Sequence, residues 1–252
     1  LVGDAWQPEA VENLAHGPPD RQDRFIKKVL AVLDEAKAAG MVVDWEQIDP
    51  VYKQDIAAFL DRLTDALHGD GKELWLCVQP GQDLDYIDFD DLSENVDRFV
   101  ALLFDETAEI DTHGPLGSRR WFEGWLQVLL EDADTRQWII VLGNYGYDWM
   151  DGAKKAEFIS VPEAMSRASY AGVETAVVSA PEYNPFFEYE DVDKGHTVWV
   201  LDGVTFANQI RAVRDKKAGG FGLYRLGAED AGIWDAFGLP TTAGEHTVGE
   251  EG

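Results

Sequence analysis

Basic residues are scarce in this sequence. Its 252 residues include 21 Lys and Arg against 48 Asp and Glu, which gives a formal net charge of -27. A negative field of this size repels phosphate backbones and argues against a nucleic-acid partner. Cysteine is nearly absent: Cys77 stands alone, which excludes an internal disulfide and predicts that it packs as a small hydrophobic residue.

Metal-ligand patterns and long apolar runs are also missing. The five histidines are scattered without ligand-like spacing, so the sequence predicts no metal site, and no motif indicates a cofactor. No apolar run approaches the ~20 residues needed to cross a bilayer, and residues 1–20 have no signal-peptide pattern. The hydrophobic content of 45% indicates a globular chain, whose length fits one α/β barrel or one large sandwich as well as two domains.

Apolar strands alternate with amphipathic helices along the chain, which predicts an α/β fold built from parallel βα units. Apolar residues at helical spacing predict helices over residues 20–39, after Pro50, and over 90–97, 118–130, 161–170 and 204–217. Short apolar runs predict strands at residues 41–46, 74–78, 99–104, 138–142 and 220–226. We expect Gly40 to end the first of these helices.

The stretch 175–201 departs from this alternation. Residues 186–189 and 197–201 can pair as an antiparallel hairpin across a polar turn, and we interpret 175–201 as a small inserted β element. Residues 143–149 are predicted to form a Gly- and aromatic-rich loop. Because no linker interrupts the pattern, we expect one domain at 1–238, followed by a flexible tail at 239–252.

Two carboxylates stand at the end of the first predicted strand. Side chains alternate in a strand, so Asp44 and Glu46 would share one side of it. Their repulsion and partial burial would raise one pKa and leave the other group ionised, as an acid catalyst and its partner require. The pair alone fits an exposed strand end equally well.

Polar and aromatic residues also follow the later predicted strands. They are Gln79, Asp105, Glu106, Asn144, Tyr145, Arg225 and Glu229. Although strand ends are polar in many α/β proteins, a βα barrel builds its active site at the C-terminal ends of its strands, and this pattern favours such a site. The chain also holds 9 Trp and 8 Tyr, whose flat faces can stack on sugar rings.

The residues from Gly40 to Glu46 resemble the fourth-strand motif D-G-x-D-x-D-x-E of glycoside hydrolase family 18. Asp44 and Glu46 match its last two acids, whereas Ala39 and Val42 stand in place of the first two. Later motifs of the family match in the expected order at Leu102–Asp105, Leu142–Gly146 and Gly222–Leu226. The resemblance covers about residues 5–234.

Two stretches, 105–122 and 143–149, are similar to a bacterial subgroup of this family. In that subgroup the domain is fused to a membrane-bound family 2 glycosyltransferase and often to a polysaccharide deacetylase. The resemblance implies an extracytoplasmic domain of a membrane-associated protein whose partner is an amino-sugar polysaccharide or oligosaccharide.

The family resemblance implies a chitinase-like, retaining hydrolase of β-1,4-linked N-acetylglucosamine polymers, in which the sugar's acetamido oxygen replaces the enzyme nucleophile. By this analogy Glu46 protonates the leaving oxygen, and Asp44 orients the acetamido group and stabilises its developing charge. Asp105 supports the sugar or the carboxylate network. The candidates for substrate binding are Phe104, Gln79, Asn144, Tyr145, Tyr224 and Glu106.

The resemblance also implies a TIM-type (β/α)8 barrel, but its first two strands have no counterpart in these residues, so we expect an opened barrel or strands supplied from elsewhere. Val42 replaces an interior Asp and should change how the proton on Asp44 is shared. Phe104 lacks the phenol that bonds the acetamido carbonyl in the family, and loss of one such donor can cost ~100-fold in rate.

Three hypotheses therefore stay open. Retention of Glu46 beside Asp44 favours a hydrolase. Val42, Phe104 and Tyr224 favour a non-catalytic carbohydrate-binding domain that serves a fused polysaccharide synthase. An unrelated barrel or scaffold is the third.

Overall fold

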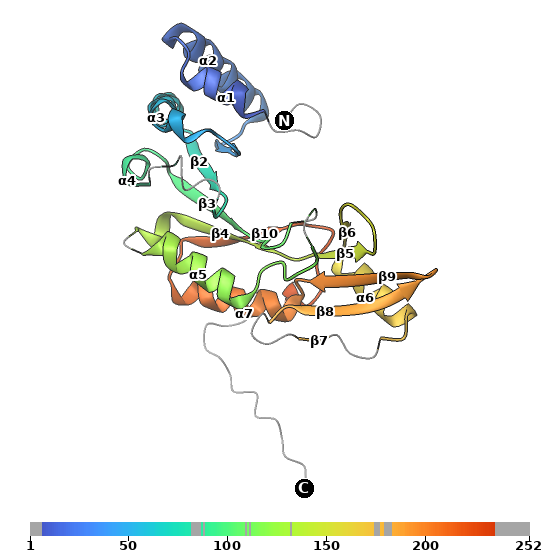
Figure 1. Ribbon diagram of the computed structural model, residues 1–252. Coiled ribbons are helices and arrows are strands. Elements are labelled where there is room, and N and C mark those ends of the chain that lie inside the picture. The colour runs from blue at the N-terminus through green and yellow to red at the C-terminus, as the bar shows by residue number, and fades with distance from the viewer. Residues whose placement is uncertain are drawn as a thin grey trace. The chain divides into compact units, whose positions relative to one another are not determined.

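The computed structural model describes residues 7–81, 87, 89–108, 110, 112–131, 133–173, 177–178 and 183–234. The predicted tail at 239–252 lies outside these residues. The chain divides into two compact units, whose elements are labelled in Figure 1. Unit 1 comprises residues 1–103, 124–141 and 216–222, and unit 2 comprises 104–123, 142–215 and 223–252. The expectation of one domain over 1–238 stays a prediction.

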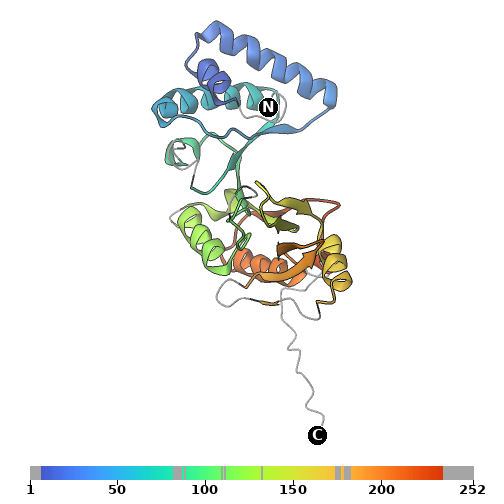
Figure 2. The ribbon, with the colours of Figure 1, turned by 45° about the vertical axis from the view of Figure 1, so that its right-hand side comes forward.

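Unit 1 begins with helices. They are α1 (Pro8–Ala15), α2 (Pro19–Ala36), α3 (Lys53–Gly69) and the short α4 (Phe89–Leu92), with one 3-10 turn, η1 (Pro50–Tyr52), before α3. Figure 2 shows α1, α2 and α3 side by side. The apolar stripe that predicted α3 is buried, with Leu60, Leu63 and Leu67 each 0% exposed. Among the described residues, no helix is both long and apolar enough to cross a membrane.

The first sheet confirms the predicted α/β order. Its strands are β1 (Gly40–Val43), β2 (Glu73–Val78), β3 (Arg98–Leu103), β4 (Trp138–Gly143) and β10 (Gly220–Tyr224), which neighbour one another in that sequence. β1 pairs with β2 and β2 with β3, both in parallel. Cys77 is buried in β2, as predicted. The expectation about absent barrel strands concerns residues beyond those described and stays a prediction.

Gly40 has a different role from the one predicted. Helix α2 ends at Ala36, and Lys37 adopts the left-handed conformation that closes it, with φ of 54°. Gly40 instead lies in β1 against β2, where a Cβ atom would come within 2.3 Å of the carbonyl oxygen of Glu73. The close approach of the two strands therefore requires glycine at this position.

Unit 2 contains an antiparallel sheet that is larger than the predicted inserted element. The strand order is β6 (Glu157–Ile159), β5 (Gly146–Met150), β9 (Lys194–Val200), β8 (Pro185–Asp191) and β7 (Val177–Val178). The predicted hairpin is confirmed as β8 and β9 (Figure 1). The predicted loop at 143–149 is wrong in part, because it contains β5. Alternating aromatic residues, rather than an apolar run, form this strand.

Three helices complete the described chain. They are α5 (Arg119–Leu130), α6 (Val161–Tyr170) and α7 (Gly203–Asp215), with a 3-10 turn, η3 (Thr135–Gln137), before β4. The bounds of α6 agree with the prediction. Residues Val198 and Val200 of β9 pack with Ala164 of α6, while Trp199 between them belongs to an aromatic cluster. The period of two along β9 therefore separates two apolar layers.

A buried carboxylate ties α6 to this sheet. The Asp148 side chain is 1% exposed and lies on the α6 side of β5, opposite Val198. It accepts hydrogen bonds from Arg167 of α6 at 2.5 Å, from Tyr189 at 2.6 Å and from His196 Nδ1 at 2.8 Å. Three donors compensate for the burial of one charge. The pKa of Tyr189 rises to about 12, because burial and then this carboxylate oppose its ionisation.

Replacing Arg167 by alanine leaves the carboxylate of Asp148 without its guanidinium partner. We expect the free energy of unfolding to fall by about 3 kcal/mol, because breaking a buried ion pair strands the remaining charge. The matched variant Glu157→Gln removes a partner of Arg167 that is 62% exposed, and it should cost less than about 1 kcal/mol. Urea denaturation of both variants measures the difference, and equal losses would contradict the expectation.

Candidate active site

Asp44 and Glu46 follow β1 rather than lying in it. The strand that was predicted over 41–46 ends at Val43, so the two carboxylates occupy the irregular segment beyond its carboxyl end. Trp45 between them packs against Phe59 of α3, with ring centroids 6.0 Å apart. Although the ladder has ended, this aromatic contact holds the segment to unit 1.

Glu46 is joined to one of the predicted substrate-binding residues. Gln79 follows the carboxyl end of β2, and its Nε2 donates a hydrogen bond to Glu46 Oε1. The parallel register pairs Val43 with Leu76, so the residues after both strands emerge at the same edge of the sheet. The structure thus brings Glu46 and Gln79 together, as strand-end geometry predicted.

Asp44 has an altered acidity. It remains exposed to solvent, yet the surrounding protein removes enough water from its carboxyl group to raise its pKa above the ordinary value. The preceding acid of the family motif is replaced here by Val42, whose side chain is 51% exposed. A higher pKa keeps a larger fraction of Asp44 protonated in mildly acidic solution.

A second group of predicted residues lies in unit 2 around Asp105. Tyr145 donates its phenolic hydrogen to Asp105 Oδ1, and Tyr147 donates to Oδ2 at 3.4 Å. Burial, followed by the nearby charge of Asp105, raises the pKa of Tyr145 well above its ordinary value. Tyr145 therefore stays a neutral hydrogen-bond donor to the Asp105 carboxylate.

The backbone at Asp105 adopts the left-handed region, with φ of 61°. Aspartate tolerates this conformation better than most residues, and non-glycine residues in it cluster at functional sites. Asp105 comes two residues after the end of β3. At this turn the Asp105 carboxylate accepts the hydrogen bonds from Tyr145 and Tyr147.

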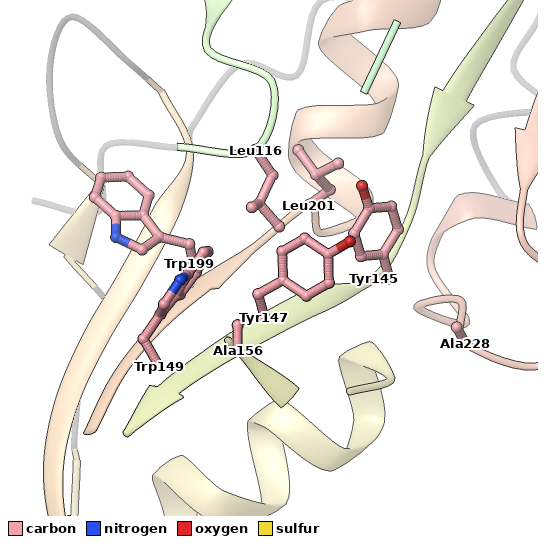
Figure 3. Packing of buried hydrophobic residues seen from close by; sticks show 8 residues of the cluster. All are labelled: Leu116, Tyr145, Tyr147, Trp149, Ala156, Trp199, Leu201 and Ala228. Atoms are coloured by element: carbon pink, nitrogen blue, oxygen red, sulfur yellow. The ribbon is translucent and has the colours of Figure 1, made fainter. Parts of the chain in front are cut away.

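An aromatic cluster surrounds these tyrosines (Figure 3). Tyr145, Tyr147 and Trp149 occupy alternate positions along the chain at β5, and Trp199 lies opposite Tyr147 in β9. Phe104 stacks on Tyr224, with ring centroids 4.7 Å apart and ring planes 10° apart. Phe104, which replaces the phenol of the family motif, thus has an aromatic partner of its own in unit 2.

Two further candidates have structural partners. Asn144 is 0% exposed: its Nδ2 donates to the carbonyl of Leu201 at 2.6 Å, and its Oδ1 accepts from the amide of Asp230 at 2.6 Å. Glu106 accepts from the amide and hydroxyl groups of Ser118, at 2.6 and 3.0 Å, ahead of α5. These bonds support the loops around the aromatic cluster, and sugar contacts by either residue stay a prediction.

Sequence reasoning did not single out Tyr147 as a site residue, although it placed Arg225 and Glu229 at the strand end after β10. The spacing of two between Tyr145, Tyr147 and Trp149 was the available signal, because it is the period of a strand. After β10, the guanidinium of Arg225 lies 4.4 Å from the centroid of the Phe158 ring, a cation–π distance. Within the described ranges, no group of three or more His, Cys, Asp or Glu residues could hold a metal ion.

The chain is similar in sequence to known proteins. A sequence model described as glycosyl hydrolases family 18 matches residues 7–229. YdhD of Bacillus subtilis strain 168, a candidate sporulation-specific glycosylase, is 23% identical over 237 residues, which cover 90% of this chain and 56% of YdhD.

Solved structures share the fold of this chain. The spore cortex-lytic enzyme SleL of Bacillus megaterium QM B1551 has a TM-score of 0.84 and 20% identity, covering 93% of this chain and 56% of SleL. A chitinase of Chromobacterium violaceum ATCC 12472 has a TM-score of 0.84 and 21% identity, covering 94% of this chain and 75% of the chitinase. The chain thus spans little more than half the length of YdhD and SleL. At these identities the likeness concerns the fold, and it confirms the predicted TIM-type α/β architecture.

The raised pKa of Asp44 has a consequence for stability. The folded protein holds the proton of Asp44 more tightly than the unfolded chain does, in which the pKa is near 3.8. Ionising this carboxyl group therefore destabilises the folded protein, and the loss of stability grows as the pH rises above 3.8. We expect Asp44→Asn to be more stable than the wild type near neutral pH and to lose this advantage on acidification towards 3.8. Urea denaturation over this range measures it, and an advantage that grows on acidification would contradict it.

Proposed function

Because the chain belongs to glycosyl hydrolases family 18, we propose that it hydrolyses a β-linked N-acetylglucosamine-type polysaccharide by a substrate-assisted, retaining mechanism. Family membership and chitinase-like neighbours support glycosidase chemistry in general. The observation that carries the finer proposal is the geometry of Glu46, which follows Asp44 by two residues beyond the end of β1 and is held by Gln79.

In the proposed reaction, the acetamido oxygen of the substrate attacks the anomeric carbon while Glu46 protonates the leaving glycosidic oxygen. Asp44 orients the acetamido group and stabilises the positive charge that develops on it. Water then opens the cyclic intermediate by attack on the anomeric carbon, the ionised Glu46 accepts a proton from this water, and the original anomeric configuration is restored. The hydrogen bond from Gln79 restrains the Glu46 carboxyl during both steps.

The residues around Asp105 are proposed to support the sugar. Two phenols bind this carboxylate, so it is an ordered acceptor for a sugar hydroxyl or amide group. The stacked rings of Phe104 and Tyr224 supply apolar surface of the kind that packs on pyranose faces. Tyr224 is 38% exposed, which leaves part of its ring available for a ligand.

Glu46→Gln tests the proposed acid. We expect hydrolysis of N-acetylated chitooligosaccharides to fall by about 100-fold or more, because a positioned general acid contributes about 10²–10⁴ in rate, while oligosaccharide binding persists. Glu188→Gln is the matched control, since Glu188 is an exposed residue of β8. Product release by chromatography and binding by calorimetry supply both readouts. Equal turnover of wild type and Glu46→Gln would refute the assignment.

Phe104→Tyr tests whether a missing donor limits the reaction. A tyrosine can keep the stack with Tyr224 and return the phenol that the family uses for the acetamido carbonyl. We expect kcat on N-acetylated substrates to rise by about tenfold or more, within the range for one preorganised donor. Phe104→Leu, which loses the stack, should not gain activity. An unchanged kcat in Phe104→Tyr would show that this donor is not limiting.

A non-catalytic role in holding carbohydrate is the second candidate. Val42 in place of an acid and Phe104 in place of a phenol favour it, since both changes remove polar groups and leave apolar and aromatic surface. This alternative predicts binding of chitooligosaccharides, or of partly deacetylated glucosamine polymers, with no wild-type turnover. The turnover measurement on the wild type therefore decides between the two candidates.

We also infer from the subgroup resemblance that the parent protein joins this domain to a membrane-bound family 2 glycosyltransferase. The domain would then trim or cut the polysaccharide that its own synthase makes, outside the cytoplasm. Reading the parent gene on both sides of the present residues tests this proposal, and a parent without a glycosyltransferase would refute it.

A further inference from the structure

A cavity of about 390 Å³ opens on unit 2, and none of the residues assigned above to hydrolysis lines it. Its walls come from the start of α5, from the segment before β8 and from α7, with Arg119, Tyr183, Asn184 and Gln209 among the lining residues. Small-molecule sites have volumes of about 300–1,000 Å³, so one sugar unit is within its capacity.

Gln209, which lines this cavity, carries a buried acceptor that has no partner among the described residues. Gln209 is 5% exposed, and its Nε2 donates to the carbonyl of Gly117 at 3.3 Å. The same carbonyl accepts from Asn184 Nδ2 at 3.1 Å. Because Gly117 offers an acceptor, the Gln209 amide nitrogen must face it, and Oε1 must face away. That oxygen is unpaired within the described ranges, and a buried acceptor of this kind requires a donor.

The rim of the cavity offers an aromatic face and further polar groups. Tyr183 is 46% exposed, and the Arg119 guanidinium lies 5.6 Å from the centroid of its ring. Arg211 donates to Asn208 Oδ1 at 3.0 Å. Two guanidinium groups and the carboxylates of Glu123 and Asp215 line the same space, so their formal charges cancel. A neutral ligand therefore fits the cavity better than an anion, which the whole acidic chain would also repel.

We propose that this cavity binds one neutral N-acetylated sugar unit of the polysaccharide. A hydroxyl or acetamido N–H supplies the donor that Gln209 Oε1 needs, the ring of Tyr183 packs on the sugar, and the guanidinium of Arg211 donates to sugar oxygens. The identity of the polysaccharide rests on the proposed function. A second point of attachment would keep a long chain on the protein between cleavage events.

The test uses the Glu46→Gln chain, in which bound sugar is not consumed, and the trimer of N-acetylglucosamine as the probe. Titration is followed by the NMR resonance of the Gln209 side-chain amide, assigned by its disappearance in Gln209→Leu. We expect the resonance to shift on titration. Tyr183→Ala should weaken that response by about tenfold, the size expected for loss of an aromatic anchor. Val204→Ala on α7, which does not line the cavity, is the matched control.

Activity separates this proposal from the previous one. In the chain with intact Glu46, Tyr183→Ala and Gln209→Leu should leave turnover of a soluble trimer unchanged and slow release from insoluble polymer several-fold. A Gln209 resonance that does not shift on titration with the trimer, or that shifts more with an oligosaccharide of glucuronic acid, would overturn the cavity proposal. Neither result would contradict the proposed hydrolase. Trimer binding at the cavity, together with no turnover by the chain with intact Glu46, would overturn the hydrolase alone.

Discussion

The parallel pairing of β1, β2 and β3 is the constraint on which the candidate site depends. Gly40 allows β1 to approach β2 so closely that no side chain fits between Gly40 and the carbonyl of Glu73. With Val43 opposite Leu76, the chain segments after both strands leave the ladder at one edge. Glu46 and Gln79, which are far apart in the sequence, thereby come within hydrogen-bonding distance. Backbone geometry, rather than side-chain attraction, brings the acid and its amide partner together.

The carboxylates of the chain are kept in different electrostatic environments. Asp44 loses hydration and becomes harder to ionise, whereas Asp105 accepts hydrogen bonds from two phenols. Asp148 is the most deeply buried of the three and is compensated by three donors. Such divergence is typical of proteins that use some carboxylates for chemistry and others to hold elements in place. In this chain the structural role belongs to Asp148, because its partners join α6 to the sheet.

The departures from the family motif also have physical consequences. The Phe104 side chain cannot donate a hydrogen bond, but its ring stacks on that of Tyr224. The position has therefore lost a polar group and kept an aromatic ring. Val42 removes a charge next to the pair of acids, and desolvation is left as the cause that raises the pKa of Asp44. Each change replaces a polar group of the family motif by an apolar one, while the acid Glu46 is retained. Hydrolysis with an altered substrate preference is the proposal that accommodates all three observations.

The sequence by itself determined the α/β order, the amphipathic face of α3, the hairpin of β8 and β9, and the residues Asp44 and Glu46, because each depends on local periodicity or on a contiguous motif. It misplaced the end of β1, interpreted β5 as loop and assigned Gly40 to a helix end. Those features depend on partners distant in the chain: β2 for Gly40 and for the end of β1, and the β9 ladder for β5. Only the tertiary structure decided that Asn144 and Glu106 form hydrogen bonds with loop residues and that Tyr147 donates a hydrogen bond to Asp105. Local spacing in the sequence cannot predict hydrogen-bond partners that are distant in the chain.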